Sequence, residues 1–177
     1  TIRHPQALGT ADGTPGTGTI VNSTPIFGTG SLQLDGAAFA GGGFTVVNER
    51  LTINDDGLAG PGGLGSLYNL SGNNEWTGPV FVGSTINNAF SVTIGVNTLT
   101  DLTISGNLID APLVFFPFPV FKIGAGRLIL PTANPNYTTD MTIVQGVISI
   151  RDSLALGPTT PGTGDTIVSF GAALHLE

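Results

Sequence analysis

A short phrase near the start of this 177-residue chain recurs near its end, and it limits the architectures open to the chain. The phrase consists of Ile-Arg, Ala-Leu-Gly, Pro-Gly-Thr-Gly and Thr-Ile-Val, and its first copy occupies residues 2–21. The second copy occupies residues 150–168, so that matching elements lie 146 to 148 residues apart. A nearly constant offset with one small indel indicates a repeated structural unit. The sequence therefore predicts a single segment, residues 1–177, made of one period of about 148 residues and the start of the next.

Short runs of alternating apolar and polar residues fill the rest of the chain. No stretch of a dozen residues carries apolar side chains at helical spacing without Gly or Pro. The runs are three to five residues long and end in Gly, Asn, Asp or Pro; they cover residues 31–34, 45–48, 51–53, 80–82, 90–94, 102–104, 127–130, 141–144, 147–150, 166–168 and 173–176. This pattern predicts an all-β protein in which each strand buries one face.

A sandwich, a barrel and a solenoid all satisfy that pattern. Strands of about four residues are short for a sandwich, and Asn-Gly or Asp-Gly turns between matched runs, the signature of hairpins, are scarce. Strand, bend, strand and longer turn follow one another instead, which favours a parallel β-helix, or β-solenoid. At roughly 20–25 residues per coil, we expect seven or eight coils and a right-handed rod about 35–40 Å long.

Composition narrows the classes of partner. The net charge is −7, with only 5 basic residues, so the chain has too little positive charge to bind a nucleic-acid backbone. There is no Cys, which excludes disulfides and thiolate metal sites. The longest apolar run, residues 113–121, has nine residues and two prolines, whereas a membrane-spanning helix needs about 20 apolar residues.

The C-terminal half resembles the autotransporter-associated β-strand repeat. The resemblance rests on the order of Lys122-x-Gly-x-Gly-x-Leu-x-Leu130, Asn134-Pro-Asn-Tyr137, Thr142-Ile-Val, Gly146-Val-Ile, Ala155-Leu-Gly and Gly171-Ala-Ala-Leu174. A second copy begins at residues 68–78, and the resemblance covers residues 1–34 and 68–177 well and 35–67 loosely. Two departures are Thr138-Thr139-Asp140, where the family usually has a Gly, and residues 108–121, where it often has a Gly-rich turn.

The resemblance implies a right-handed β-helix of the passenger type, found in large bacterial surface proteins. In that family the repeat is a scaffold without catalytic residues, so the resemblance implies no catalytic, metal-binding or cofactor-binding residue in this chain. It also implies an extracellular or cell-surface location.

Acidic residues are the only candidates for carbohydrate chemistry or calcium binding. Asp55 and Asp56 are the only adjacent pair, and in an Asn-Asp-Asp-Gly run they predict a turn more strongly than an active site or a calcium site. Five further residues stand singly near strand ends and are also expected in turns: Asp101, Asp110, Asp140, Asp152 and Asp165. His4 and His175 are expected to face solvent, and Gly41-Gly42-Gly43 to form a turn, because no helix or Lys follows it.

One tract does not fit a simple scaffold. Phe115, Phe116, Phe118 and Phe121 provide four of the ten Phe residues within seven positions. They are expected either to fold over the flank of the solenoid or to form an exposed interface with a neighbouring subunit, and carbohydrate binding is a third reading.

These observations favour a structural function. We expect an extracellular fibre or stalk segment whose partners are neighbouring repeats or identical subunits, stacked end to end through free strand edges. The alternatives are a passenger adhesin that binds cell-surface ligands, with cell-surface or matrix polysaccharide among its partners, and a carbohydrate-active β-helix enzyme.

Overall fold

The computed structural model of the protein describes residues 1–9, 14, 17–22, 30–39, 41–54, 57, 63–83, 91–111 and 118–177. These residues form β-strands joined by turns and contain no helix, and every strand pairing is parallel. Sheet 1 contains β1 (Thr19–Val21), β4 (Leu51–Ile53), β7 (Val80–Val82) and β10 (Leu108–Asp110). Sheet 2 contains β2 (Leu32–Asp35), β5 (Leu67–Ser71), β8 (Val92–Val96), β11 (Val120–Ile123), β13 (Met141–Ile143) and β15 (Thr166–Val168). Sheet 3 contains β3 (Thr45–Val46), β6 (Asn74–Trp76), β9 (Asp101–Ile104), β12 (Arg127–Leu130), β14 (Val147–Ile150) and β16 (Ala173–Leu176).

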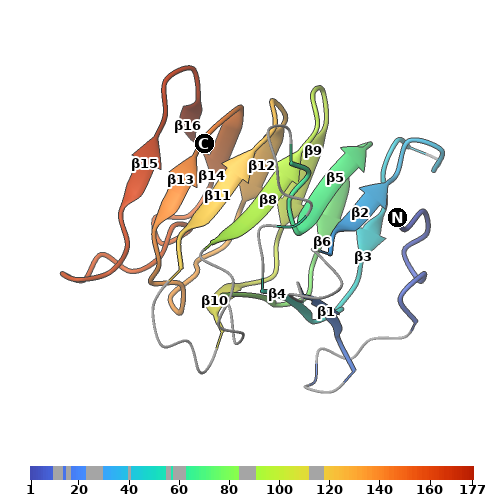
Figure 1. The fold of residues 1–177 in the computed structure, drawn as a ribbon, viewed down its shortest axis with the longest axis horizontal. Coiled ribbons are helices and arrows are strands. Elements are labelled where there is room, and N and C mark those ends of the chain that lie inside the picture. The colour runs from blue at the N-terminus through green and yellow to red at the C-terminus, as the bar shows by residue number, and fades with distance from the viewer. Residues whose placement is uncertain are drawn as a thin grey trace.

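The chain visits the three sheets in turn and advances by one strand in each at every pass. The result is a parallel β-solenoid of about five turns, which confirms the predicted all-β solenoid. Figure 1 shows sheets 2 and 3 running along the long axis from the N-terminal to the C-terminal coils, with β1, β4 and β10 of sheet 1 along another side.

The prediction of seven or eight coils is wrong because most coils are longer than assumed. Val92 pairs with Val120, 28 residues later, whereas Val120 pairs with Met141, only 21 residues later. The longer coils include a strand of sheet 1, and the last two coils do not. Sheet 1 therefore has 4 strands where sheets 2 and 3 have 6 each.

Columns of inward side chains form the core. In sheet 2, Leu67 lies beside Ile94, and Ile94 beside Lys122 in the next coil; all three are fully buried. In sheet 3, Val46 lies beside Trp76 and Trp76 beside Ile104. Inward and outward residues alternate along the strands, as the period of two requires, so each coil stabilises the next by covering its apolar face.

The two copies of the repeated phrase lie on different faces of the solenoid. Thr19–Val21 forms β1 in sheet 1, whereas Thr166–Val168 forms β15 in sheet 2. The turns that precede them also differ: Ala7 is exposed, but Ala155 is fully buried. The two copies therefore do not form the same type of coil. A three-residue strand and a tight turn are local features, and they fit any face where the neighbouring coil supplies the contacts.

Candidate functional site

Lys122 is a buried cation at the corner between sheets 2 and 3. Its Nζ donates hydrogen bonds to the carbonyl oxygens of Gly124 (2.5 Å), Gly126 (2.5 Å) and Gln145 (2.8 Å), in its own turn and in the turn of the next coil. Burial lowers the pKa of Lys122 to about 8, while the three carbonyl oxygens act in the opposite direction by favouring the ammonium. The side chain thus ties two successive turns together.

Two further residues of the resembling motif also donate hydrogen bonds to the backbone, and one of them connects coils. Asn134 accepts a hydrogen bond from the backbone N–H of Leu108 (2.7 Å) and donates one to the carbonyl of Ala155 (2.6 Å), which spans three successive coils. Tyr137 is fully buried, and its hydroxyl donates to the carbonyl of Asp140 (2.9 Å). Burial raises the pKa of this phenol far above its usual value. All these groups hold the backbone.

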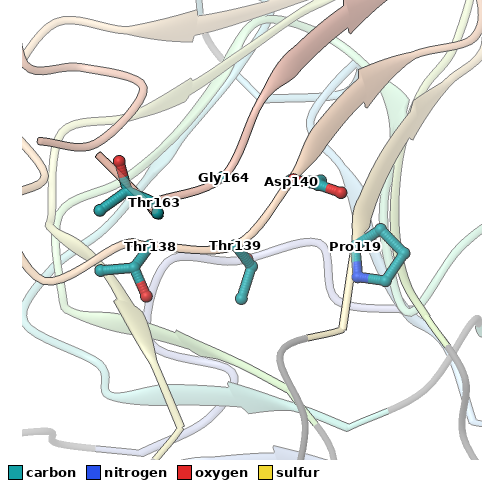
Figure 2. Close-up of a pocket in the computed structure, with 7 residues that line it drawn as sticks. Pro119, Thr138, Thr139, Asp140, Thr163 and Gly164 are labelled. Carbon is teal, nitrogen blue, oxygen red and sulfur yellow. The ribbon is translucent and has the colours of Figure 1, made fainter. Parts of the chain in front are cut away.

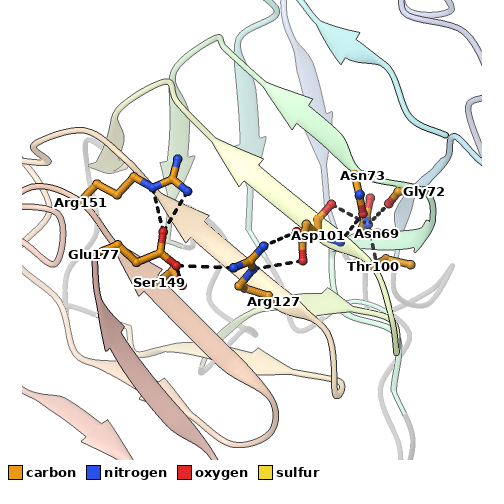
Figure 3. Close-up of polar contacts among 9 residues, drawn as sticks. All are labelled: Asn69, Gly72, Asn73, Thr100, Asp101, Arg127, Ser149, Arg151 and Glu177. Atoms are coloured by element: carbon orange, nitrogen blue, oxygen red, sulfur yellow. Dashed lines mark hydrogen bonds and ion pairs between the residues drawn. The ribbon is translucent and has the colours of Figure 1, made fainter. Parts of the chain in front are cut away.

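In the N-terminal coils, asparagine side chains form the hydrogen bonds at the same corner between sheets 2 and 3. Asn69 donates to the carbonyl of Gly72, the hydroxyl of Thr100 and the carbonyl of Asp101, as Figure 3 shows. Asn74 donates to Asn69 Oδ1 (2.7 Å) and accepts from the N–H of Phe44 (3.0 Å). A sequence pattern could have indicated these residues only through their position just before or after a Gly turn.

An ion-pair ladder crosses the outer face of sheet 3. Arg127 pairs with Asp101 at 2.6 Å and with Glu177 at 3.5 Å, and Arg151 pairs with Glu177 at 2.9 Å (Figure 3). These groups lie in different coils and are partly exposed, so each pair is worth little to stability by itself. The ladder joins oppositely charged side chains of different coils, and each of its four charged groups has a partner.

The predicted acidic turn residues take structural positions. Asp55 and Asp56 lie outside the described residues. Asp140 accepts from the N–H of Asp165, and Asp152 accepts from the N–H of Leu154 within a turn. The turn prediction is wrong for two residues: Asp101 is the first residue of β9, and Asp110 is the last residue of β10, where it accepts from the N–H of Thr138. No group of three or more metal-ligating side chains is found in the part of the chain that the structure describes.

The histidines and the glycine run lie where the sequence predicts. His4 and His175 are both exposed, and His4 contacts the edge of the Phe39 ring. Gly41 and Gly42 have positive φ values in the turn between β2 and β3. Gly43 has no room for a side chain, because a Cβ there would lie 1.9 Å from the carbonyl oxygen of Asn73.

A small hollow lies beside the segments that lead into β13 and β15. Figure 2 shows Thr138, Thr139 and Asp140 along one segment, with Thr163 and Gly164 next to them and Pro119 at one end. Its volume is about 140 Å³, below the roughly 300 Å³ at which small-molecule pockets begin. It provides one carboxylate, that of Asp140, and this group already accepts a backbone hydrogen bond. The hollow has the size for a few water molecules rather than for a sugar chain.

The Phe tract is only partly described. Phe115 and Phe116 lie outside the described residues. Phe118 and Phe121 are half-buried, and Phe121 occupies an outward position of β11 between Thr93 and Thr142. The proposed interface at these residues stays a prediction.

The two ends of the solenoid expose what the interior coils cover. Val168 pairs with the fully buried Ile143, and Leu176 pairs with Ile150, so both residues continue inner columns. In this last described coil, Val168 is 44% exposed and Leu176 is 77% exposed. β15 and β16 pair on one side only, as do β1 and β3 at the other end of sheets 1 and 3. At the N-terminal end of sheet 2, Ile2 bridges to Leu34.

Comparison with protein-family models, with curated proteins and with solved structures found no match to this chain. Among the described residues, no helix is long and apolar enough to cross a membrane. The fold and the contacts within the chain are therefore the basis for a functional proposal.

Proposed function

We propose that this chain is a structural segment of an extracellular or cell-surface bacterial protein, in which β-solenoid coils stack end to end into a fibre or stalk. The observation that carries the proposal is the coil-to-coil pairing, in which successive strands of sheets 2 and 3 add in parallel along the axis. In the last described coil, β15 and β16 are each paired on one side, and Val168 and Leu176 continue inner columns. Free edges with apolar side chains template the addition of another strand.

The interior of the molecule supports a scaffold. Lys122, Asn134 and Tyr137 are motif residues of the autotransporter-associated β-strand repeat in this sequence, and each uses its polar atoms to hold backbone within or between coils. A right-handed passenger-type β-helix of this family accounts for such a set. In such a fold, polar side chains that hydrogen-bond the backbone at the corners recur along the axis and need not bind a ligand. The partners we propose are neighbouring repeats or identical subunits.

A charge placed on the exposed inner column tests this function. Leu176→Lys leaves an isolated chain unaffected, since the side chain is 77% exposed, but it buries an ammonium if another coil covers β16. Leu99→Lys is the matched control, because Leu99 is 96% exposed in a turn far from both ends. Sedimentation velocity over a range of concentrations is the measurement.

We expect the sedimentation coefficient of the wild type and of Leu99→Lys to rise with concentration, and that of Leu176→Lys to stay at the monomer value. A wild-type chain that remains monomeric at all concentrations, or a Leu176→Lys chain that associates as the wild type does, overturns the proposal.

A further inference from the structure

Three Asn-x-Ser/Thr triplets occur in the sequence, and this triplet is the acceptor pattern for N-linked glycosylation. They begin at Asn22, Asn69 and Asn136. In a chain with this much Asn, Ser and Thr, a triplet alone is a weak signal of modification. The structure separates the three, because a glycan is bulky and requires an asparagine side chain that reaches solvent in the folded protein.

Asn69 cannot carry a glycan in the folded chain. Its side chain is fully buried at the corner between sheets 2 and 3, and its amide nitrogen already donates three hydrogen bonds within the chain (Figure 3). A sugar on this nitrogen would replace those contacts and displace the next coil. Asn22 accepts a hydrogen bond from Asn54, and the other two residues of its triplet lie outside the described residues.

Asn136 lies on a tight turn in the segment that leads to β13. The N–H of Tyr137 donates to the carbonyl of Asn134 (3.1 Å), so that Pro135 and Asn136 take the two central positions of a β-turn. Asn136 is exposed, and its side-chain amide makes no hydrogen bond to the part of the chain that the structure describes. Its amide nitrogen is therefore available from solvent.

The other residues of this triplet anchor the turn without involving the Asn136 side chain. Tyr137 is fully buried, whereas Thr138 is exposed. The carbonyl of Asn136 accepts the N–H of Asp110 (2.9 Å), and Thr138 donates both its N–H (2.9 Å) and its hydroxyl (2.5 Å) to the Asp110 carboxylate. A glycan on Asn136 therefore projects from a turn whose backbone and core contacts it leaves intact.

We propose that Asn136 is an acceptor for N-linked glycosylation by a glycosyltransferase whose other substrate is a sugar activated by a diphosphate at its anomeric carbon. The amide nitrogen of Asn136 attacks the anomeric carbon. The new nitrogen–carbon bond forms as the bond from that carbon to the diphosphate oxygen breaks. The diphosphate keeps the bonding electrons, and a base of the transferase takes the amide proton. Because the Thr138 hydroxyl is bonded to Asp110 in the folded chain, its recognition precedes closure of the turn.

Peptide mass spectrometry of the protein isolated from the cells that make it tests the site. Trypsin separates the triplets, because it leaves Asn136 in the peptide of residues 128–151 and Asn69 in that of residues 51–122. We expect the 128–151 peptide to carry the mass of whole sugar residues, placed on Asn136 by fragmentation, and the 51–122 peptide to carry none at Asn69. A single hexose identifies a nucleotide sugar as the donor, whereas an oligosaccharide of fixed composition identifies a lipid-linked donor.

Three variants, made in the same cells, assign the signal to the triplet. Asn136→Gln removes the acceptor nitrogen, Thr138→Ala removes the hydroxyl that the triplet requires, and Thr138→Ser is the matched control that keeps a hydroxyl. We expect the sugar to be lost from the first two variants and kept by Thr138→Ser. Urea unfolding verifies that each variant is folded.

An unmodified 128–151 peptide in the wild-type protein overturns the inference. Sugar that persists in Asn136→Gln or Thr138→Ala also overturns it, as does a glycan on Asn69 in the folded protein. The inference does not depend on end-to-end stacking, which the sedimentation measurements test separately.

Discussion

Replacing Lys122 by methionine tests whether a buried ammonium holds the corners of this solenoid together. The change keeps an unbranched side chain of similar length but removes three hydrogen bonds to carbonyl oxygens. Gly126 still receives the N–H of Val147, but the oxygens of Gly124 and Gln145 receive no other backbone donor among the described residues. Two partly buried acceptors therefore lose their charged donor.

The expected cost follows from these two lost hydrogen bonds. Each of these hydrogen bonds to a charged group contributes about 1.5–3 kcal/mol, and the relief from no longer burying a charge returns part of the total. We expect a net destabilisation of about 3 kcal/mol, which corresponds to a fall in Tm of about 6–12 °C for a chain of this size. Ile143→Met is the matched control, because Ile143 is the residue that pairs with Lys122 in the next coil. A hydrophobic swap of this kind costs less than about 1.5 kcal/mol.

Urea unfolding followed by the fluorescence of the single, fully buried Trp76 measures both variants. The chain is kept at a concentration where it is monomeric, and the m-value must match that of the wild type for the comparison to hold. A Lys122→Met chain as stable as the wild type or as Ile143→Met would refute the reasoning, because the ammonium would then contribute no more than an apolar side chain.

Two further outcomes follow from the same corner. Burial lowers the pKa of Lys122 from 10.5 to about 8, so the unfolded chain binds more protons than the folded chain between these pH values. The free energy of unfolding of the wild type, relative to that of Lys122→Met, should therefore rise from pH 8 to pH 10. A constant or falling difference between the two proteins contradicts this. Gly124→Ala places a Cβ 2.3 Å from the carbonyl oxygen of Val96, at a φ of 76°. We expect this variant to lose at least about 2 kcal/mol more stability in urea unfolding than Gly162→Ala, because Gly162 also has a positive φ but open space around it. Equal losses of stability would refute the steric argument.

Strict alternation predicts most of the strands of this chain whose inward positions are apolar, although it misses β1 and β10. The runs at residues 51–53, 80–82 and 147–150 match β4, β7 and β14 residue for residue. β5, β6 and β11 escape the pattern, because their inward positions include Asn69, Asn74 and Lys122. Those side chains are buried only because a neighbouring coil provides their hydrogen-bond partners, and that contact is not a property of the strand itself.

The number of coils and the faces they occupy are harder to predict, because both depend on the length of the turns. The period-two signal does not record whether a coil forms two strands or three, and sheet 1 accordingly ends at β10 without a sequence signal. The repeated phrase does not predict position, since its two copies lie in different sheets.

Electron cryomicroscopy of the concentrated wild-type chain tests the central claim most directly. End-to-end stacking predicts unbranched filaments whose strands lie perpendicular to the axis. The axial repeat should be close to the height of one molecule, about 30 Å for the 6 strands of sheet 2 at roughly 4.8 Å each. Dispersed single particles, or filaments without this repeat, would contradict the account.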